Sequence, residues 1–191
     1  MLAYLIGSIS STCIVGYLAG RFDMRNEPDG KISAVAIHKK MGFFPFVCVS
    51  LMDISLAILA VAIAGMLTGS PNIMMLAGIA TVVGHNWSIF LKLKGGLGAT
   101  AILGVLTAMI TWQVIYGLIA CAIIFLLTQK PGLSTILGIV TLSGTMSILN
   151  GIGTLALYPL VLFSLMLLKR FQVAWLPRPG RSSQTTSTRF T

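Results

Sequence analysis

The near absence of charge over most of the sequence is the strongest constraint on how this chain folds. Only 9% of its residues are Asp, Glu, Lys or Arg and 56% are hydrophobic, whereas about a quarter of a soluble domain is charged. Inside a bilayer every backbone polar group needs a partner within the protein, so long apolar stretches are expected to be helices. Barrel strands would alternate polar and apolar residues over about ten positions, and no such alternation is found. The chain is therefore expected to be an all-α integral membrane protein.

Apolar stretches of suitable length define the expected spans. A helix that crosses a membrane needs about 20 apolar residues, with about 17–25 tolerated. On that basis the sequence predicts seven transmembrane helices, near residues 2–20, 43–67, 72–91, 98–112, 113–128, 133–149 and 152–168. The fourth and fifth are short, and their junction at Thr111-Trp112-Gln113 is the weakest boundary. One long kinked helix across that junction would reduce the number of spans to six.

The positions of the basic residues favour seven spans. All 13 lysines and arginines lie in four segments, within residues 21–40, 92–94, 130 and 169–189. Three other connections carry no charge, near residues 68–71, 112 and 150–151. Seven spans make basic and uncharged connections alternate, as the positive-inside rule requires, whereas six would separate Lys130 from Lys92 and Lys94. The predicted topology places the N-terminus outside and the C-terminus in the cytoplasm, in a multi-pass protein of the cell membrane.

The net charge of +9 is therefore expected to gather on the cytoplasmic membrane face. Such a face attracts anionic lipid head groups or phosphorylated substrates. Nucleic-acid binding is not expected, because no soluble domain is present to dock into a groove. The three cysteines lie inside predicted spans without metal-type spacing, so neither a metal site nor a cofactor is expected. Residues 177–191 are predicted to be a disordered basic tail, which leaves residues 1–176 as one transmembrane domain.

Lysines and glycines interrupt the apolar sequence within residues 84–104. The lysines are Lys92 and Lys94, and the glycines that follow them are Gly95, Gly96 and Gly98. Glycines let the backbone approach a ligand closely, and free N–H groups at the start of the next helix attract anions. Together these features predict a phosphate-handling loop on a membrane face. The alternative is a basic, flexible loop between two spans.

Two ionisable residues lie within predicted spans. Asp53 is the only acid inside a hydrophobic segment, and an ionisable group within a membrane is costly enough to indicate a function. At a helical rise of about 1.5 Å per residue, Asp53 lies about 15 Å from the start of its span and His85 about 10 Å from Lys92, so the two are expected to meet at similar depth. The structural alternatives are that Asp53 caps loop backbone and that His85 hydrogen-bonds to a neighbouring carbonyl.

Several short motifs together carry a resemblance to a known family. They are Tyr-Leu-Ile-Gly-Ser-Ile from residue 4, Asp53, Gly84-His85 and Lys94-Gly95-Gly96-x-Gly98. Over about residues 4–168 the chain resembles the PlsY family of bacterial membrane acyltransferases. The resemblance implies seven spans, an outside N-terminus and motif loops on the cytoplasmic face. It also implies transfer of a fatty acyl group from acyl phosphate to glycerol 3-phosphate, giving lysophosphatidate for phospholipid synthesis without a cofactor.

The resemblance implies roles for particular residues. The expected catalytic residues are Lys94, His85 and Asp53, with His85 and Asp53 orienting the loops. The expected phosphate cradle consists of Lys94 and the N–H groups of Gly95, Gly96 and Gly98. A second anion site is expected from Lys39, with Arg25 and the backbone near Gly30. The acyl chain would lie between spans, open to membrane lipid.

Departures from the family pattern leave a second function open. Ser10 stands in place of a proline in the opening motif, and Leu97 in place of the second lysine of the glycine loop. Leu56 and Ala57 replace a lysine and a glycine after Asp53. A C-terminal His-Arg-x-Asn motif is absent, and residues 168–173 read Leu-Lys-Arg-Phe-Gln-Val instead. The alternative function is therefore a catalytically degenerate PlsY-like membrane protein that binds an anionic lipid or a phosphorylated metabolite.

Overall fold

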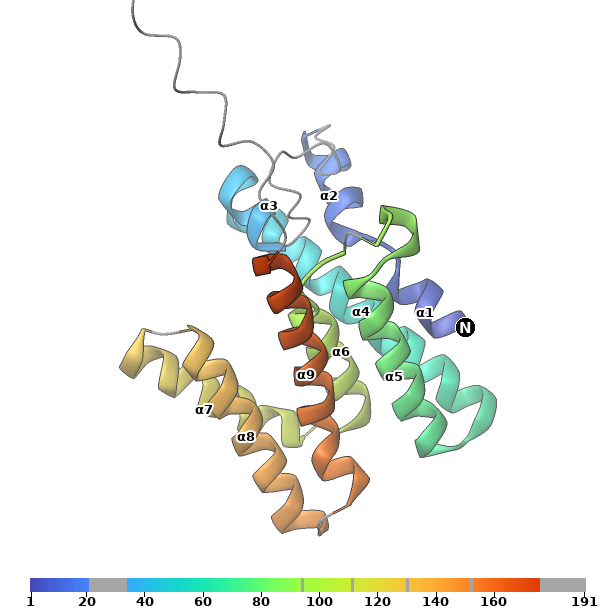
Figure 1. The fold of residues 1–191 in the computed structure, drawn as a ribbon, viewed down its shortest axis with the longest axis vertical. Helices are drawn as coiled ribbons and strands as arrows, with labels where there is room; N and C mark the ends of the chain where they lie inside the picture. The colour runs from blue at the N-terminus through green and yellow to red at the C-terminus, as the bar shows by residue number, and fades with distance from the viewer. Residues whose placement is uncertain (21–33, 94, 111, 130, 152, 176–191) are drawn as a thin grey trace, which may run out of the picture.

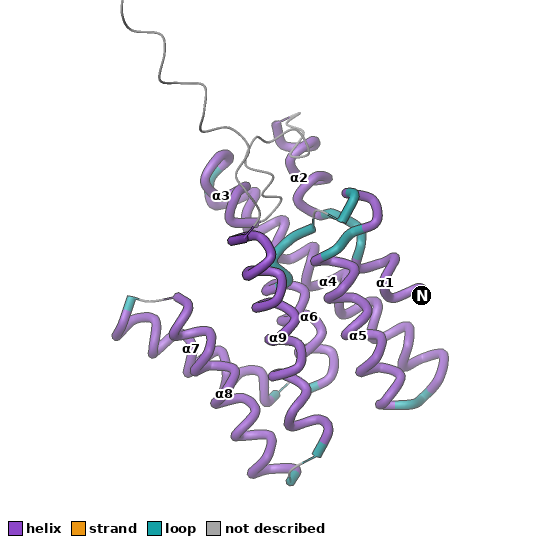
Figure 2. The backbone as a smooth tube through the Cα atoms, viewed as in Figure 1, coloured by secondary structure: helices purple, strands orange, loops and turns teal. Residues whose placement is uncertain are grey.

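A computed structural model describes residues 1–20, 34–93, 95–110, 112–129, 131–151 and 153–175. Every element within these ranges is helical (Figures 1 and 2). The α-helices are α1 (Leu2–Gly7), α2 (Ser11–Gly20), α3 (Ala34–Met41), α4 (Phe43–Thr68), α5 (Pro71–Asn86), α6 (Ala99–Met109), α7 (Gln113–Thr128), α8 (Pro131–Asn150) and α9 (Thr154–Trp175), and a short 3-10 helix, η2 (Ile89–Leu91), follows α5. The all-helical prediction is confirmed for this part of the chain. The predicted tail at 177–191 lies outside it.

The lengths of the helices match the predicted stretches. Four segments are long and apolar enough to cross a membrane: Leu2–Ala19, Phe43–Thr68, Pro71–Leu91 and Thr154–Trp175. Three apolar helices are shorter: Ala99–Met109, Gln113–Thr128 and Leu133–Leu149. Seven helical segments thus coincide with the seven predicted stretches. Seven crossings stay a prediction, since length and composition alone support four.

The first predicted span consists of two helices. α1 ends at Gly7 and α2 begins at Ser11, so the helix is interrupted at residues 8–10. A Cβ added to Gly7 would collide with the carbonyl oxygen of Thr81 in α5, and a Cβ on Gly84 with that of Tyr4 in α1. Such small residues allow two helix backbones to approach closely. The interruption separates α1, which packs on α5, from α2, which packs on α3 and α4.

The boundary between the fourth and fifth predicted spans is also resolved. α6 ends at Met109 and α7 begins at Gln113, and the two helices run in different directions (Figure 1). A single kinked helix across this junction is therefore wrong. The break falls within a residue or two of the predicted one.

The hydrophobic core lies where α4, α5, α6 and α9 meet, and α8 extends it. Val61 of α4, Val105 of α6 and Leu162 of α9 are fully buried. α4 and α6 are in close contact, because a Cβ on Gly104 would lie 2.5 Å from the carbonyl oxygen of Ile54. Large apolar side chains also cover the outer faces of the helices. A helix that is hydrophobic all round is typical of a membrane setting.

Candidate active site

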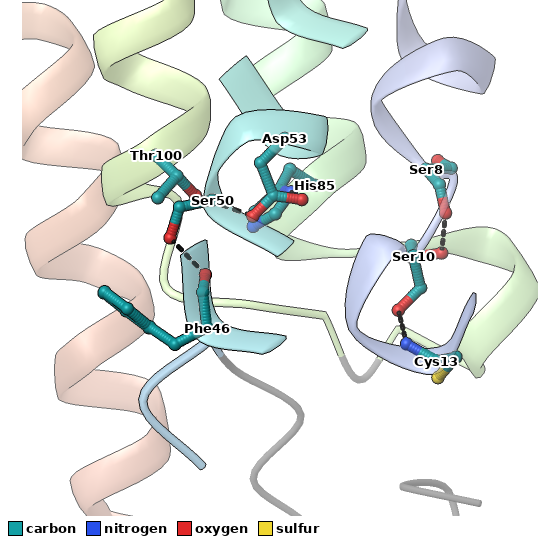
Figure 3. Close-up of polar contacts among 9 residues, drawn as sticks. Ser8, Ser10, Cys13, Phe46, Ser50, Asp53, His85 and Thr100 are labelled. Atoms are coloured by element: carbon teal, nitrogen blue, oxygen red, sulfur yellow. Dashed lines mark hydrogen bonds and ion pairs between the residues drawn. The ribbon is translucent and has the colours of Figure 1, made fainter. Parts of the chain in front are cut away.

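Three polar residues that are distant in sequence meet at the centre of the bundle (Figure 3). Asp53 comes from α4, His85 from the end of α5 and Thr100 from the first turn of α6. Thr100 Oγ1 donates a 2.7 Å hydrogen bond to Asp53 Oδ2. His85 Nδ1 lies 3.9 Å from Asp53 Oδ1, which is longer than a hydrogen bond. The structure therefore brings the two ionisable residues of the predicted spans together.

The carboxylate of Asp53 is buried and only partly satisfied. The residue is 4% exposed, and its Oδ1 has no hydrogen-bond partner. Burying a charged oxygen without a partner is unfavourable. The first turn of α6 lessens this cost, because the positive end of a helix dipole favours a negative charge. A closer approach of the His85 ring by about 1 Å would complete the pair.

The glycine loop packs directly on the end of α5. The N–H groups of Gly96 and Gly95 donate to the carbonyl oxygens of His85 (3.0 Å) and Asn86 (3.2 Å). A Cβ on Gly95 would collide with His85 O, and one on Gly96 with His85 Nε2. A Cβ on Gly98, whose φ is +79°, would collide with Asn86 Oδ1. The close approach of this loop to α5 explains why these positions are glycines. It also means that the N–H groups of Gly95 and Gly96, which the sequence predicts to bind phosphate, bond to α5 instead.

The opening motif of the chain holds this loop from the other side. Tyr4 Oη donates to the carbonyl oxygen of Trp87 at 2.8 Å. Ser88 Oγ donates to the carbonyl oxygen of Ser8 at 2.6 Å. Thr81 Oγ1 donates to Ala77 O of its own helix at 2.8 Å and lies 3.3 Å from Ala3 O. Two hydrogen bonds therefore tie the opening motif to the turn that leads into the glycine loop, and Thr81 adds a longer contact between α1 and α5.

A buried lysine contacts the same turn from α9. Lys169 is 4% exposed, and its Nζ donates to Leu93 O at 3.3 Å. The ammonium group lies 5.2 Å from the centre of the Trp87 ring, within the range of a cation–π interaction. Trp87 Nε1 in turn donates to Gln172 Oε1 at 2.8 Å. We call Lys169, Trp87, Gln172 and the carbonyl of Leu93 the C-terminal latch.

Comparison with known proteins identifies the family. A family model described as glycerol-3-phosphate acyltransferase matches residues 1–174. The chain belongs to the glycerol-3-phosphate acyltransferase family. A glycerol-3-phosphate acyltransferase of Thermoanaerobacter pseudethanolicus is 36% identical over 144 residues, which are 74% of this chain and 71% of the relative. A glycerol-3-phosphate acyltransferase 2 of Moorella thermoacetica is 42% identical over 110 residues, 57% of this chain and 56% of the relative.

Solved structures of the glycerol-3-phosphate acyltransferase family share the fold. A crystal structure of PlsY, an integral membrane glycerol 3-phosphate acyltransferase, in its glycerol 3-phosphate form, matches with a TM-score of 0.75 and 24% identity, over 93% of this chain and 92% of PlsY. The lysophosphatidic acid form of PlsY matches with a TM-score of 0.76 and 22% identity, over 94% and 92%. The resemblance to the PlsY family is therefore confirmed.

The C-terminal latch is what sequence reasoning missed in this glycerol-3-phosphate acyltransferase family member. In the sequence, residues 168–173 indicate the loss of a family motif, yet two side chains of this segment contact the residues that lead into the glycine loop. One signal was present in the sequence. Lys169 follows directly on an apolar stretch, and an ionisable group at such a place is expected to have a partner.

The second predicted anion site of this family member is only partly within the described ranges. Arg25 and Gly30 lie outside them, as does Lys94 of the predicted phosphate cradle. Lys39 belongs to α3, which packs on α2 and α4. Its side chain is not among those described, so its role stays a prediction.

Proposed function

We propose that the protein is a membrane glycerol-3-phosphate acyltransferase that transfers a fatty acyl group from acyl phosphate to glycerol 3-phosphate, giving lysophosphatidate. Family membership and relatives that carry this name support the activity. The observation that carries the proposal is the packing of the glycine loop onto His85 and Asn86, beside the buried carboxylate of Asp53. This arrangement fixes Gly95 and Gly96, which follow Lys94 in the sequence, against the end of α5.

The reaction needs no covalent enzyme intermediate, because acyl phosphate is already activated. The acceptor hydroxyl oxygen forms a bond to the acyl carbon, and the bond from that carbon to the phosphate oxygen breaks. The electron pair leaves with the phosphate, which also takes up the proton that the hydroxyl loses. The protein must therefore align two phosphate-bearing molecules and stabilise charge on the departing phosphate. Alignment alone lowers a barrier by about 7–11 kcal/mol in favourable cases, and fixed cations and dipoles supply the electrostatic part.

The proposed phosphate cradle combines a cation with the start of α6. Lys94 supplies the positive charge, and the free N–H groups that follow Gly98 supply donors at a helix N-terminus. Gly95 and Gly96 contribute the shape of the loop, because their own N–H groups bond to α5. Asp53 and His85 hold this geometry: Asp53 accepts a hydrogen bond from Thr100 at the start of α6, and the carbonyl of His85 accepts the N–H of Gly96. Lys39, Arg25 and Gly30 are proposed to bind the second phosphate.

The proposed topology has seven spans, with the N-terminus outside and the site at the cytoplasmic face. The arrangement of the connections supports it. The end of α4 and the start of α5, the end of α6 and the start of α7, and the end of α8 and the start of α9 all lie toward the lower part of the bundle in Figure 1. The ends of α3 and α9 lie toward the opposite end, and these carry Lys40, Lys169 and Arg170. A cytoplasmic basic face follows from the positive-inside rule.

An apolar groove between α6, α7 and α8 is the proposed site of the acyl chain. Its volume is about 170 Å³, and nearly all of its lining is apolar. Ala99, next to Gly98, and Ile102 line it on α6, and Leu142 lines it on α8. The groove therefore begins beside the proposed phosphate cradle and continues along the helices. An acyl chain placed there would leave its carbonyl carbon near the start of α6.

Turnover by the purified protein tests the proposed function. With acyl phosphate and glycerol 3-phosphate it is expected to release phosphate, and Lys94→Ala is expected to lower the rate by at least about tenfold, because a charge-assisted contact to phosphate is lost. Lys92→Ala is the matched control, since it removes the same charge from an exposed side chain of the same loop. It is expected to lower the rate by less than about threefold.

Complementation separates the enzyme from the degenerate binding protein. The gene is expected to rescue a bacterial strain that lacks its own glycerol-3-phosphate acyltransferase. If the protein reaches the membrane in normal amount and the strain does not grow, the enzymatic proposal fails. Equal turnover by the wild type and Lys94→Ala would instead refute the proposed phosphate cradle, while the proposed enzymatic activity would stand.

A further inference from the structure

A small cavity, lined by more apolar than polar surface, lies between the interruption of the first span and the glycine loop. Serine and threonine hydroxyls and one histidine line its polar side: Ser8, Ser10, Ser11, Thr12, Ser88 and His85. Gly95 and Gly96 close it on the side of the proposed phosphate cradle. Its volume of about 10 Å³ is enough for one oxygen the size of a water. Figure 3 shows Ser8 and Ser10 on the α1–α2 side of the view that also contains Asp53, His85 and Thr100.

Two hydroxyls at this cavity are buried without a partner. Ser8 is 0% exposed and Ser11 is 1% exposed, and neither Oγ makes a hydrogen bond within the described chain. Polar atoms that are buried this deeply are nearly always hydrogen-bonded, to protein, water or ligand. Both residues line the same cavity.

The N-terminal end of α2 makes the cavity suited to a negatively charged oxygen. α2 is a ten-residue helix that begins at Ser11, and the first N–H groups of a helix have no partner within it. Ser10 Oγ accepts the N–H of Cys13 at 3.3 Å, which leaves the N–H groups of Ser11 and Thr12 at the cavity. The positive end of the helix dipole adds to this preference. No carboxylate is among the side chains that line the cavity.

We infer that this cavity is an oxyanion subsite that binds one phosphoryl oxygen of a phosphate held at the glycine loop, with the hydroxyls of Ser8 and Ser11 as donors. The inference rests on the proposed function and extends it to a ligand class, a tetrahedral phosphate. One oxygen enters the cavity, and the rest of the phosphate lies on the side of Gly95 and Gly96. In the absence of phosphate a water occupies the same position.

The subsite gives a reason for the interruption of the first span. In an uninterrupted helix the N–H groups of Ser11 and Thr12 would bond to carbonyls four residues earlier. Ending α1 at Gly7 and restarting at Ser11 leaves these donors without a partner in α1. Ser88 Oγ, which bonds to the carbonyl oxygen of Ser8, fixes the interruption against the loop.

Binding of inorganic phosphate tests the subsite independently of turnover. Radiolabelled phosphate is titrated against the purified full-length protein in detergent, for the wild type, Ser8→Ala, Ser11→Ala and the double variant. The dissociation constant is expected to rise by about tenfold in each single variant, the usual effect of losing a hydrogen bond to an anion. Ser55→Ala is the matched control, because Ser55 is an exposed serine of α4. Ser11→Thr keeps the hydroxyl and is expected to restore binding.

The outcomes separate this inference from the proposed function. Phosphate affinity that is unchanged in the double variant, or absent in the wild type, overturns the subsite, and the hydroxyls then hold water alone. Normal acyl transfer in that case leaves the proposed function standing. If phosphate binding weakens in the serine variants and the wild type transfers no acyl group, the subsite stands and the proposed function fails. Thermal unfolding of each variant identifies a loss of binding that comes from loss of fold.

Discussion

Replacing Lys169 with methionine is expected to lower acyl transfer without unfolding the protein. The ammonium group donates to Leu93 O at 3.3 Å and lies 5.2 Å from the centre of the Trp87 ring. A hydrogen bond from a charged group contributes about 1.5–3 kcal/mol, and a cation over a desolvated ring up to about 2 kcal/mol. Methionine keeps an unbranched side chain of similar length, so the packing of α9 is largely retained.

The expected decrease in kcat/KM follows from the backbone strain of the turn that the C-terminal latch holds in place. Lys92 and Leu93 are consecutive non-glycine residues with positive φ, 52° and 66°, and a residue held in such a conformation costs about 1–3 kcal/mol. The contacts of Lys169 and the strain of the turn are therefore of similar size. Without the lysine the turn is free to relax, and the glycine loop moves with it. Since a displacement of about 1 Å lowers a rate by about 100-fold, we expect kcat/KM to fall by about 10- to 100-fold.

Steady-state phosphate release by purified variants measures this effect, with thermal unfolding in the same detergent as the check on stability. Arg170→Met is the matched control, because it removes the same charge from the adjacent, exposed position. Leu93→Gly provides a second check, since glycine adopts positive φ without penalty and the leucine side chain is 57% exposed. In the Leu93→Gly background, Lys169→Met is expected to lower kcat/KM by a smaller factor. Equal activity of the two methionine variants, or an equal loss with and without Leu93→Gly, would refute the reasoning.

Three further substitutions address the site and the groove. Thr100→Val removes the hydrogen bond to Asp53 and is expected to lower the free energy of unfolding by about 1–3 kcal/mol in denaturant titrations; an unchanged midpoint would contradict this. Gly95→Ala places a Cβ against two carbonyl oxygens of α5 and is expected to abolish turnover, whereas Gly153→Ala, with no atom within 4 Å, is expected to be neutral. Leu103→Ala enlarges the groove and is expected to raise kcat/KM for longer acyl phosphates relative to shorter ones; a constant ratio would exclude the groove.

Much of the helical organisation was predictable because the bilayer imposes simple rules. Apolar stretches had to be helical to satisfy their backbone groups, and the alternation of basic and uncharged connections identified the break between α6 and α7. The same reasoning about depth brought Asp53 and His85 together, at 3.9 Å in the structure. Both results depend on helical rise and charge, which are properties of the local sequence.

Features that depend on contacts between helices were not predictable in this way. The interruption at residues 8–10 has no charge or proline to mark it and only hydroxyl residues as a local signal, and the close approach of Gly7 to α5 beside it cannot be deduced from one sequence. The glycine loop was interpreted as a set of free donors, yet Gly95 and Gly96 donate to α5. A single sequence indicates that glycines allow a close approach and leaves open which partner they approach.

The departures from the family pattern have different consequences once they are placed in the fold. Ala57, where the PlsY pattern has glycine, is 1% exposed and faces Gly104 of α6, so the added methyl group occupies space that the opposite glycine leaves. Leu97 removes a positive charge from the glycine loop, while Lys169 contributes one to the turn that precedes it. The substitutions therefore preserve close packing at α4–α6 and a cation beside the loop.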